Sequence, residues 1–413
     1  MNTLQRLFKT ATVRDTLISF TGLGTTTAIG FVSTIILARV LGPEKFGVFS
    51  AVIALTTIVY SLGDLGIPPA LINFLPKLPQ KKDIIISTAL IAQIGICLLS
   101  VFVFLGLALF HNAIIPGSLP EHIFLALLVT LIYILTNFAQ GLFTARRQFW
   151  KYSAIQMIDS SIKIILILLL LVASRLDIST ALLANAVSSF LALIITFGKE
   201  TVLLEYRFDK AVFGQILSFS KWIAASRVFS VFFGRVDILL LNILVSSYGA
   251  GIFAAASRIT LLFTLLISSL SAVISPRYSG FTTAGEIISY SRKLLFFVFG
   301  IATLMLLTII FARPIILIVF GAQYLEAVVV FRLLAAAMLP FLFSLITTPA
   351  IIYTFNRPDF YAKVTALQVS LIVILDLLLI NRFGLLAPVL AIGIANLIAL
   401  ALSAVKFTQL LKT

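Results

Sequence analysis

The chain has 413 residues, of which 61% are hydrophobic and only 11% are charged, and its mean hydropathy is +1.17. Soluble domains are closer to half apolar and a quarter charged, so this composition excludes an ordinary soluble fold. A lipid bilayer accepts the apolar surface that water would reject. We therefore predict an all-α polytopic membrane protein.

The net charge of +15 comes from 30 Lys and Arg residues against 15 Asp and Glu residues. The basic residues are dispersed between apolar runs and form no stripe or patch, which argues against nucleic acid as a partner. One cysteine, Cys97, and two histidines, His111 and His122, are too few for a disulfide framework or a zinc site. We expect no metal centre and no cofactor.

Twelve apolar segments reach the length of about 20 residues that a helix needs to cross a bilayer. In chain order they are Thr16–Arg39, Phe46–Phe74, Ile84–Phe110, His122–Thr144, Ser153–Ser174, Ser179–Gly198, Phe213–Val245, Gly249–Ile274, Leu294–Ala312, Val328–Tyr353, Phe360–Ile380 and Leu385–Phe407. The second segment holds Gly63, Asp64 and Gly66 before Pro68 and Pro69. A bend is expected there because proline cannot donate to the helix ladder. The first segment is too long for a signal peptide and is expected to remain as a span.

Lys and Arg are distributed unevenly over the predicted loops. Nineteen lie on the side that holds both termini, and five lie on the opposite side. Because cytoplasmic loops carry the excess of basic residues, both termini are predicted to be cytoplasmic. No connecting loop is long enough to form a soluble catalytic domain, so we do not expect an enzyme.

The two halves of the chain share landmarks in the same order. LGPEKFGVFSA at Leu41–Ala51 aligns with VSSYGAGIFAA at Val245–Ala255, and flanking Ser-Phe and Pro-base pairs also align. Six spans return the chain to its starting side, so the repeat is parallel. We predict two six-helix bundles, residues 1–205 and 206–413, related by a pseudo-two-fold axis around a central cavity.

Ionisable side chains inside a membrane are expensive unless they face a cavity or a partner, so they mark candidate sites. The candidates are Asp64, Lys163, Arg227, Arg235, Asp237, Arg258 and Asp376. Guanidinium groups keep their charge when desolvated and match phosphate oxygens. The four bases are therefore candidate ligands for an anion such as a diphosphate.

The predicted depths suggest how these charges pair. Asp237 is level with Arg258 across the hairpin that turns near Ser247, so we expect an Asp237–Arg258 ion pair that leaves Arg235 facing the cavity. Lys163 follows Asp159 by four residues, so a local ion pair is the alternative there. Asp64 and Asp376 are candidates to carry a proton or bind a cation, or to cap or pair locally.

Two stretches resemble a known family. ILARVLGPEKFGVFSAVIAL, followed by DLGIPPALINFLPK, resembles the N-terminal signature of polysaccharide (O-antigen type) repeat-unit flippases, in the multidrug/oligosaccharidyl-lipid/polysaccharide exporter superfamily. GRVDILLLNILVSSYGAGIFAAASRI is similar to that family's hairpin of spans seven and eight. The resemblance implies a MATE-like fold of two six-helix bundles in a V shape that works by alternating access.

The resemblance also implies a function. The expected substrate is an undecaprenyl-diphosphate-linked oligosaccharide, moved from the cytoplasmic to the outer leaflet of the bacterial inner membrane. Arg235, Arg258 and Lys163 map onto the family's basic cavity by position in their spans. Coupling to a proton or sodium gradient, and polysaccharide polymerase or ligase machinery as partners, are further expectations. The chain lacks the extra pair of spans typical of peptidoglycan-precursor flippases, which argues against a lipid II role.

Two other classes of function remain as alternatives. A cation-coupled exporter of drugs or other amphiphilic solutes would favour a net acidic cavity, whereas these spans hold more bases than acids. A membrane glycosyltransferase, polymerase or ligase would need carboxylates gathered in one polar loop. Here Glu44, Glu121, Asp177 and Glu326 are spread over separate loops, and no DxD motif occurs.

Overall fold

The computed structural model describes residues 11–64, 66–198 and 208–412, and over these residues the chain is helical and has no β-strand. Within this described part, nine helical stretches are long and apolar enough to cross a membrane. Two of them, Thr21–Phe74 and Pro358–Leu410, have 54 and 53 residues, and each covers all or most of two predicted segments. The protein is thus an all-α, multi-pass membrane protein, while the count of twelve spans stays a prediction.

The helices divide into two compact units, Met1–Arg235 and Val236–Thr413. The predicted boundary after residue 205 lies in the segment 199–207, outside the described residues. The division in the structure comes later because α9 (Lys210–Phe233) packs against α2, α3 and α4 of the first unit. Most of the predicted seventh span therefore belongs with the N-terminal helices.

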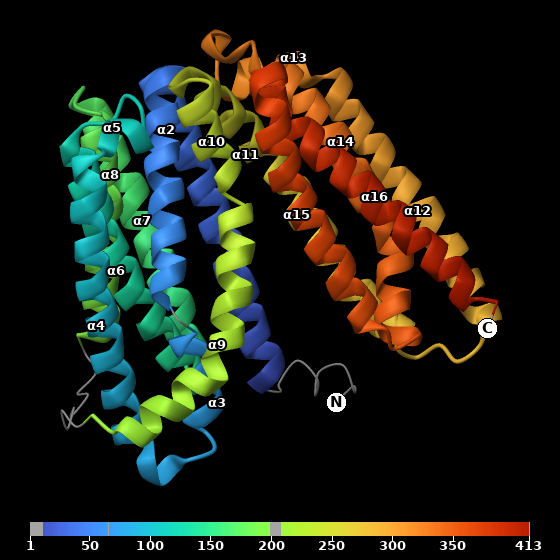
Figure 1. Cartoon of the computed structure of the whole chain (residues 1–413), viewed down its shortest axis with the longest axis horizontal. Coiled ribbons are helices and arrows are strands. Elements are labelled where there is room, and N and C mark those ends of the chain that lie inside the picture. The colour runs from blue at the N-terminus through green and yellow to red at the C-terminus, as the bar shows by residue number, and fades with distance from the viewer. Residues whose placement is uncertain (1–10, 65, 199–207, 413) are drawn as a thin grey trace, which may run out of the picture. The chain divides into compact units, whose positions relative to one another are not determined.

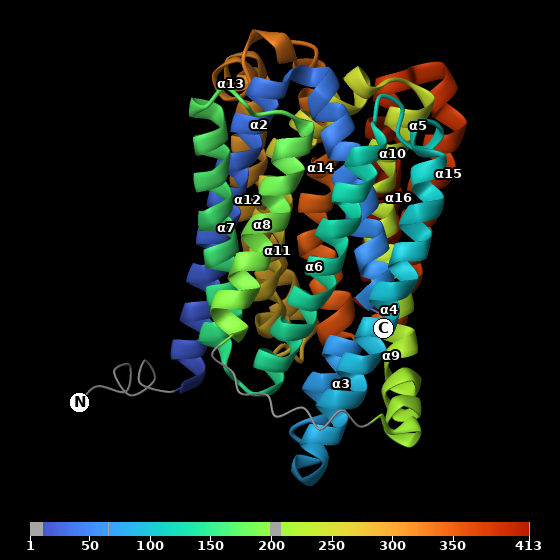
Figure 2. The same cartoon turned by 90° about the vertical axis from the view of Figure 1, so that its left-hand side faces the viewer.

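The first unit is a bundle of mostly long helices, several of which run alongside one another (Figures 1 and 2). Besides α9, its helices are α2 (Ala11–Asp64), α3 (Ile67–Phe74), η1 (Pro79–Lys81), α4 (Lys82–Leu109), α5 (His111–Ile114), α6 (Pro120–Ala145), α7 (Phe149–Val172) and α8 (Ile178–Phe197). A cluster of buried side chains from α3, α4, α6 and α9, which includes Leu71, Ile86 and Phe138, forms part of its core.

Helix α2 contains the first predicted segment and the second one up to Asp64, without a loop between them. At Gly42 the backbone has φ 72° and ψ 168°, a conformation that is essentially restricted to glycine. At this kink the chain reverses direction, and the two arms of α2 diverge from it (Figures 1 and 2). The turn predicted between Arg39 and Phe46 is therefore made almost entirely by one residue.

The bend expected near Asp64 is a complete helix break. Helix α2 ends at Asp64, α3 begins at Ile67, and Gly66 between them has a left-handed φ of 70°. The Ser220 hydroxyl of α9 donates a hydrogen bond to the Gly66 carbonyl at 2.8 Å. Gly66 thus provides both the left-handed conformation and the close approach of α9.

The second unit is built around α14, which packs against α11, α12 and α16. Its helices are α10 (Val236–Leu244), α11 (Ser247–Tyr278), α12 (Ala284–Ile310), α13 (Ala312–Val319), η2 (Ala322–Tyr324), α14 (Ala327–Pro349), the π-helix η3 (Ala350–Thr354), α15 (Pro358–Phe383), η4 (Gly384–Leu386) and α16 (Ala387–Leu410). Tyr278, which is fully buried, ties α11 to α12 and α14 through hydrogen bonds to the Ser291 hydroxyl and the Ile346 carbonyl.

The predicted seventh segment, Phe213–Val245, is not one continuous helix. Helix α9 ends at Phe233, α10 begins at Val236, and Gly234 and Arg235 form a turn between them. Glycine weakens a helix interior by about 1 kcal/mol relative to alanine, which favours the break at this position. The prediction that Arg235 faces the cavity while Asp237 pairs with Arg258 placed Arg235 and Asp237 on one continuous helix, and this premise is wrong.

Candidate functional site

Two carboxyl groups lie in contact inside the second unit. Asp237 on α10 is 8% exposed, Asp376 on α15 is fully buried, and their side chains lie within hydrogen-bonding reach of each other. Both carboxyl oxygens of Asp376 and Oδ1 of Asp237 are shielded from solvent and receive no hydrogen bond from the described residues. The pair therefore presents three buried acceptor oxygens that have no donor among the described residues.

This geometry limits what the pair can bind. An ionised carboxyl group only accepts hydrogen bonds, so two facing carboxylates repel each other unless a proton or a cation lies between them. An isolated buried charge is very unfavourable in an apolar environment. The pair can thus hold one proton shared between the two groups, or one small cation.

The Asp237–Arg258 ion pair expected from matched depths does not form in the structure. Among the described residues, the side chain that faces the Asp237 carboxyl is that of Asp376. The expectation assumed one continuous helix up to the hairpin turn, whereas α10 starts at Val236 and packs against both α11 and α15. This packing directs Asp237 to an acid on α15 instead of to Arg258 on α11.

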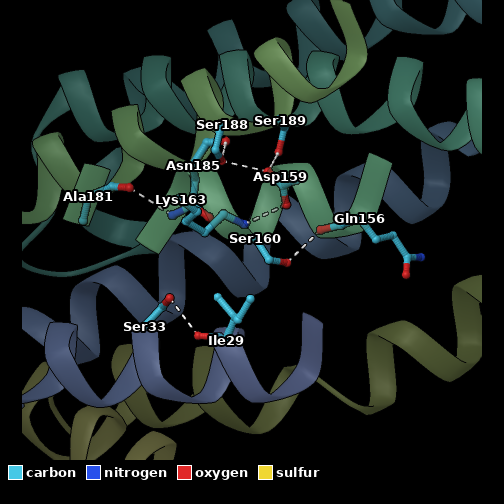
Figure 3. A network of polar contacts seen from close by, with 10 residues as sticks. All are labelled: Ile29, Ser33, Gln156, Asp159, Ser160, Lys163, Ala181, Asn185, Ser188 and Ser189. Carbon is cyan, nitrogen blue, oxygen red and sulfur yellow. Dashed lines mark hydrogen bonds and ion pairs between the residues drawn. The ribbon is translucent and has the colours of Figure 1, made fainter. Parts of the chain in front are cut away.

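The first unit holds a second polar cluster, centred on Asp159 of α7 (Figure 3). Lys163 Nζ donates to Asp159 Oδ2 at 3.1 Å, and the two side chains are 19% and 20% exposed. The hydroxyls of Ser188 and Ser189 on α8 both donate to Asp159 Oδ1 at 2.7 Å. Asp159 therefore accepts three hydrogen bonds, which join α7 to α8.

The pairing changes the interpretation of Lys163. The local ion pair with Asp159, which the spacing offered as the alternative, is present, and Tyr133 of α6 also lies beside Lys163. Asp159 neutralises most of the positive charge that an incoming anion would meet. The geometry therefore favours a structural role for Lys163 in holding α6, α7 and α8 together.

The remaining candidate site residues lie in different elements of the structure. Arg235 lies in the turn between α9 and α10, Arg258 lies in α11, and both are partly buried. Asp64 is the last residue of α2 and is 4% exposed. Arg227 lies within α9, and its side chain is outside the described residues.

The family-level comparison places this chain among proteins of glycan synthesis. A family model described as "Polysaccharide biosynthesis protein" matches residues 12–281, which is more than half of the chain. The chain belongs to this polysaccharide biosynthesis family. The resemblance seen in the LGPEKFG turn and in the hairpin of spans seven and eight is thus confirmed. The comparison with curated protein sequences returned no match.

Solved structures show the fold of this polysaccharide biosynthesis family member. The lipid II flippase MurJ in an inward closed conformation matches with a TM-score of 0.73 and 17% identity, covering 94% of this chain and 87% of MurJ. MATE in its straight conformation matches with a TM-score of 0.60 and 14% identity, covering 97% and 95% of the two chains. A mutant of the Vibrio cholerae MATE transporter VcmN matches with a TM-score of 0.56 and 15% identity, again covering 97% and 95%. These likenesses confirm the predicted MATE-like fold.

Sequence reasoning identified most of the charged residues of these clusters and offered the Lys163–Asp159 pair as an alternative, but it did not predict the Asp237–Asp376 contact. Asp237 and Asp376 were both candidates, yet helices from distant parts of the chain bring them together. Asp159 was considered only as a neighbour of Lys163, whereas it is the centre of the cluster in the first unit. The adjacent Ser188 and Ser189 were the available signal, because paired hydroxyls in an apolar span need a polar partner.

Proposed function

We propose that this protein is a flippase that moves undecaprenyl-diphosphate-linked oligosaccharide repeat units from the cytoplasmic to the outer leaflet. The observation that carries the proposal is the polysaccharide biosynthesis family match over residues 12–281, on a chain with a MATE-like fold. A lipid-linked glycan must cross the bilayer before it can be used outside the cell, and the MurJ and MATE structures with this fold are named as a flippase and as transporters. Transport is therefore the step that fits the chain best.

The diphosphate is the charged part of such a substrate. Arg235 and Arg258 are the bases that we assign to it, because both are partly buried in or between spans and guanidinium groups match phosphate oxygens. Arg227, eight residues before Arg235, is the third candidate. Lys163 is held by Asp159, so we assign it to the scaffold of the first unit.

The Asp237–Asp376 pair is the proposed coupling site. Taking up a proton or a sodium ion removes the repulsion between the two carboxyl groups, and losing it restores that repulsion. An alternating-access cycle through a basic central cavity can use this difference, because a ligand shifts a conformational equilibrium by its differential affinity for the two states. Asp64 is a weaker candidate for the same role.

Several features of the cellular setting belong to the same proposal. Lys and Arg are in excess in the predicted loops on the side of the membrane that holds both termini. This excess supports a bacterial inner-membrane protein with both termini in the cytoplasm. The expected partners are the lipid-linked glycan, the surrounding lipids and the polymerase or ligase that uses the glycan on the outer face. O-antigen-type repeat units are the expected class of cargo.

A cation-coupled exporter of drugs or other amphiphilic solutes is the second candidate. The likeness to MATE structures and the buried carboxyl pair favour it. The two candidates differ in the charge of the cargo, since a lipid diphosphate needs basic ligands and a cationic drug needs acidic ones. The surplus of bases over acids within the predicted spans supports the flippase.

The test is transport by the purified full-length protein in liposomes. Lipid-linked glycans extracted from the native host are placed in one leaflet, and their appearance in the other is scored with a membrane-impermeant lectin. Translocation above that of protein-free liposomes is expected. Absence of translocation by folded protein, together with efflux of ethidium in the same liposomes, would replace the flippase by the drug exporter.

A further inference from the structure

The second unit contains a cavity of about 810 Å³ that the proposed diphosphate and coupling sites do not use. It lies between α11, α14, η3, α15 and α16, and its volume is within the range of roughly 300–1,000 Å³ found for small-molecule sites. None of the residues that line it is charged, in a chain whose net charge is +15. The cavity therefore suits an uncharged ligand better than a diphosphate, a metal ion or a drug cation.

Hydroxyl groups line the cavity from several helices. Helix α11 contributes Ser268, Ser271 and Ser275, and its C-cap residue Ser279 follows; their spacing of three or four residues puts them on one face of the helix. Ser344 and Thr348 on α14 and Thr365 on α15 complete this hydroxyl wall. Such a row is unusual for the apolar interior of a membrane bundle, where each polar group needs a partner.

The internal hydrogen bonds show what these hydroxyls can offer to a ligand. The hydroxyl of Ser275 donates to the Ser271 carbonyl at 2.7 Å, and that of Ser344 donates to the Phe341 carbonyl at 2.6 Å. Their protons are used, but their oxygens can still accept. The hydroxyls of Ser271 and Thr365 make no hydrogen bond within the described part of the chain, so they can also donate. The wall thus presents both donors and acceptors.

A pair of amides at the cavity is oriented by a backbone carbonyl. Asn396 Nδ2 donates to the Ala337 carbonyl at 2.8 Å, which leaves Asn396 Oδ1 to accept from Gln368 Nε2 at 2.6 Å. Because the Gln368 nitrogen is committed to this bond, its Oε1 is the atom of that amide left to accept from a ligand. Both side chains line the cavity, so the site contains a preset acceptor.

Two tyrosines give the cavity flat apolar surfaces. Tyr353 and Tyr361 line it and are 49% and 45% exposed, so their rings are accessible. A sugar ring has apolar C–H faces and a rim of hydroxyls, each of which can donate and accept. A hydrocarbon tail would use the aromatic surface but leave the hydroxyl wall and the amide without partners, which is unfavourable.

We infer that this cavity binds uncharged sugar residues of a glycan, with Ser271, Thr365 and Gln368 as hydrogen-bonding residues and Tyr353 and Tyr361 as ring-stacking residues. The inference rests on the proposed function and deepens it, because it gives the neutral glycan and the charged diphosphate separate sites. Sugar specificity then resides in the second unit, on α11 and α15. Arg235 and Arg258 recognise the diphosphate, which all substrates share.

The test compares the binding of two lipids to the purified full-length protein in nanodiscs. One is the host's polyprenyl-diphosphate-linked glycan, and the other is undecaprenyl diphosphate without a glycan. The double variant Ser271→Ala/Thr365→Val removes two hydroxyls that make no internal hydrogen bond. Each hydrogen bond contributes about 1 kcal/mol, or roughly fivefold in affinity, so about a 25-fold loss is expected for the glycan-bearing lipid. Binding of undecaprenyl diphosphate should not change.

The matched control is Ser269→Ala/Thr303→Val. These exposed residues lie on α11 and α12, do not line the cavity and donate to carbonyls of their own helices. The control should bind both lipids like the wild type. An unchanged affinity of the Ser271/Thr365 variant for the glycan-bearing lipid, or an equal loss for both lipids, would overturn the assignment.

A labelling experiment covers the case in which the double variant folds poorly. In a Cys97→Ser background, Ser271→Cys places one thiol in the cavity, and the glycan-bearing lipid should slow its reaction with maleimide while undecaprenyl diphosphate should not. Equal protection by both lipids, or by neither, would exclude the sugar site. Failure of the proposed function looks different: the wild type would not flip the glycan in liposomes, although the lipid would still protect the thiol.

Discussion

The carboxyl groups of Asp237 and Asp376 lie against each other inside the second unit, brought together by helices that are far apart in the chain. Neither group has a donor among the described residues for the oxygens that are shielded from solvent. A buried pair of acceptors is unstable as two anions, so its occupancy by a proton or cation should affect stability and, if the pair is the proposed coupling site, transport.

Replacing Asp376 by asparagine should separate these two effects. The amide can donate to Asp237, so the Asp376→Asn variant should unfold at the same temperature as the wild type or higher, by the equivalent of about 1 kcal/mol. Its transport should be lost or become independent of the proton and sodium gradients. Thermal unfolding in detergent and liposome transport with imposed gradients measure the two quantities.

The same pair predicts how the wild type responds to ions. Sodium, or a lower pH, should raise the unfolding temperature of the wild type but not that of Asp376→Asn, because only the wild type needs a charge between the carboxyl groups. Asp83→Asn, which changes an exposed acid at the start of α4, is the control for general salt effects. Equal responses of all three proteins would remove the pair from coupling.

The Asp159 cluster should be structural. Asp159→Asn leaves Lys163 mostly buried without its counter-ion, and breaking a buried pair in this way costs about 3 kcal/mol. The double variant Asp159→Asn/Lys163→Met should recover most of that stability and should still transport. A double variant that folds, as judged by thermal unfolding, but fails to transport would return Lys163 to the substrate path.

Arg235 should be essential for transport. Arg235→Ala should abolish translocation of the lipid-linked glycan at normal membrane levels, while Arg235→Lys should keep part of it, because an ammonium retains the charge but not the bidentate fork. Arg382→Ala, an exposed base in the last turn of α15, serves as the matched control. Full activity of the Arg235→Ala variant would exclude this residue from diphosphate binding.

Gly66 should tolerate substitution by alanine less well than Gly95, another glycine of the first unit. A Cβ atom there would lie 3.0 Å from the carbonyl oxygen of Ser220, and the left-handed φ adds about 1–2 kcal/mol of strain for alanine. Gly95 in α4 has open space around it, so Gly95→Ala should stabilise the helix by about 1 kcal/mol. Opposite shifts of the unfolding temperature are expected, and equal shifts would contradict the close contact between Gly66 and Ser220.

The sequence predicted the helices well because each span is a local property. The segment Ile84–Phe110 became α4 (Lys82–Leu109), and Ser179–Gly198 became α8 (Ile178–Phe197). The length and hydropathy of such a segment determine that it forms a membrane-spanning helix, whichever helices surround it. The break after Phe233 was missed because Gly234 is one weak signal within an apolar run, whereas the break near Gly66 was marked by two glycines and two prolines.

The partners of the charged residues were less predictable because they depend on which helices become neighbours. Spacing of four residues was enough to predict the Lys163–Asp159 pair. Matched depth was not enough to predict the partner of Asp237, since α10 packs against both α11 and α15 and Asp376 lies on the latter. The cavity beside α11 was not predicted, because it depends on how α11, α14, α15 and α16 pack.

The kink at Gly42 has a consequence for how the protein is made and altered. Because a single residue joins the two arms of α2, there is no loop in which extra residues could be absorbed. The two arms therefore have to insert into the membrane as one hairpin. The first arm cannot reach its final position until the second arm has been synthesised. An epitope tag or a reporter fused at this turn should therefore disturb membrane insertion itself, before any effect on the proposed transport could be measured.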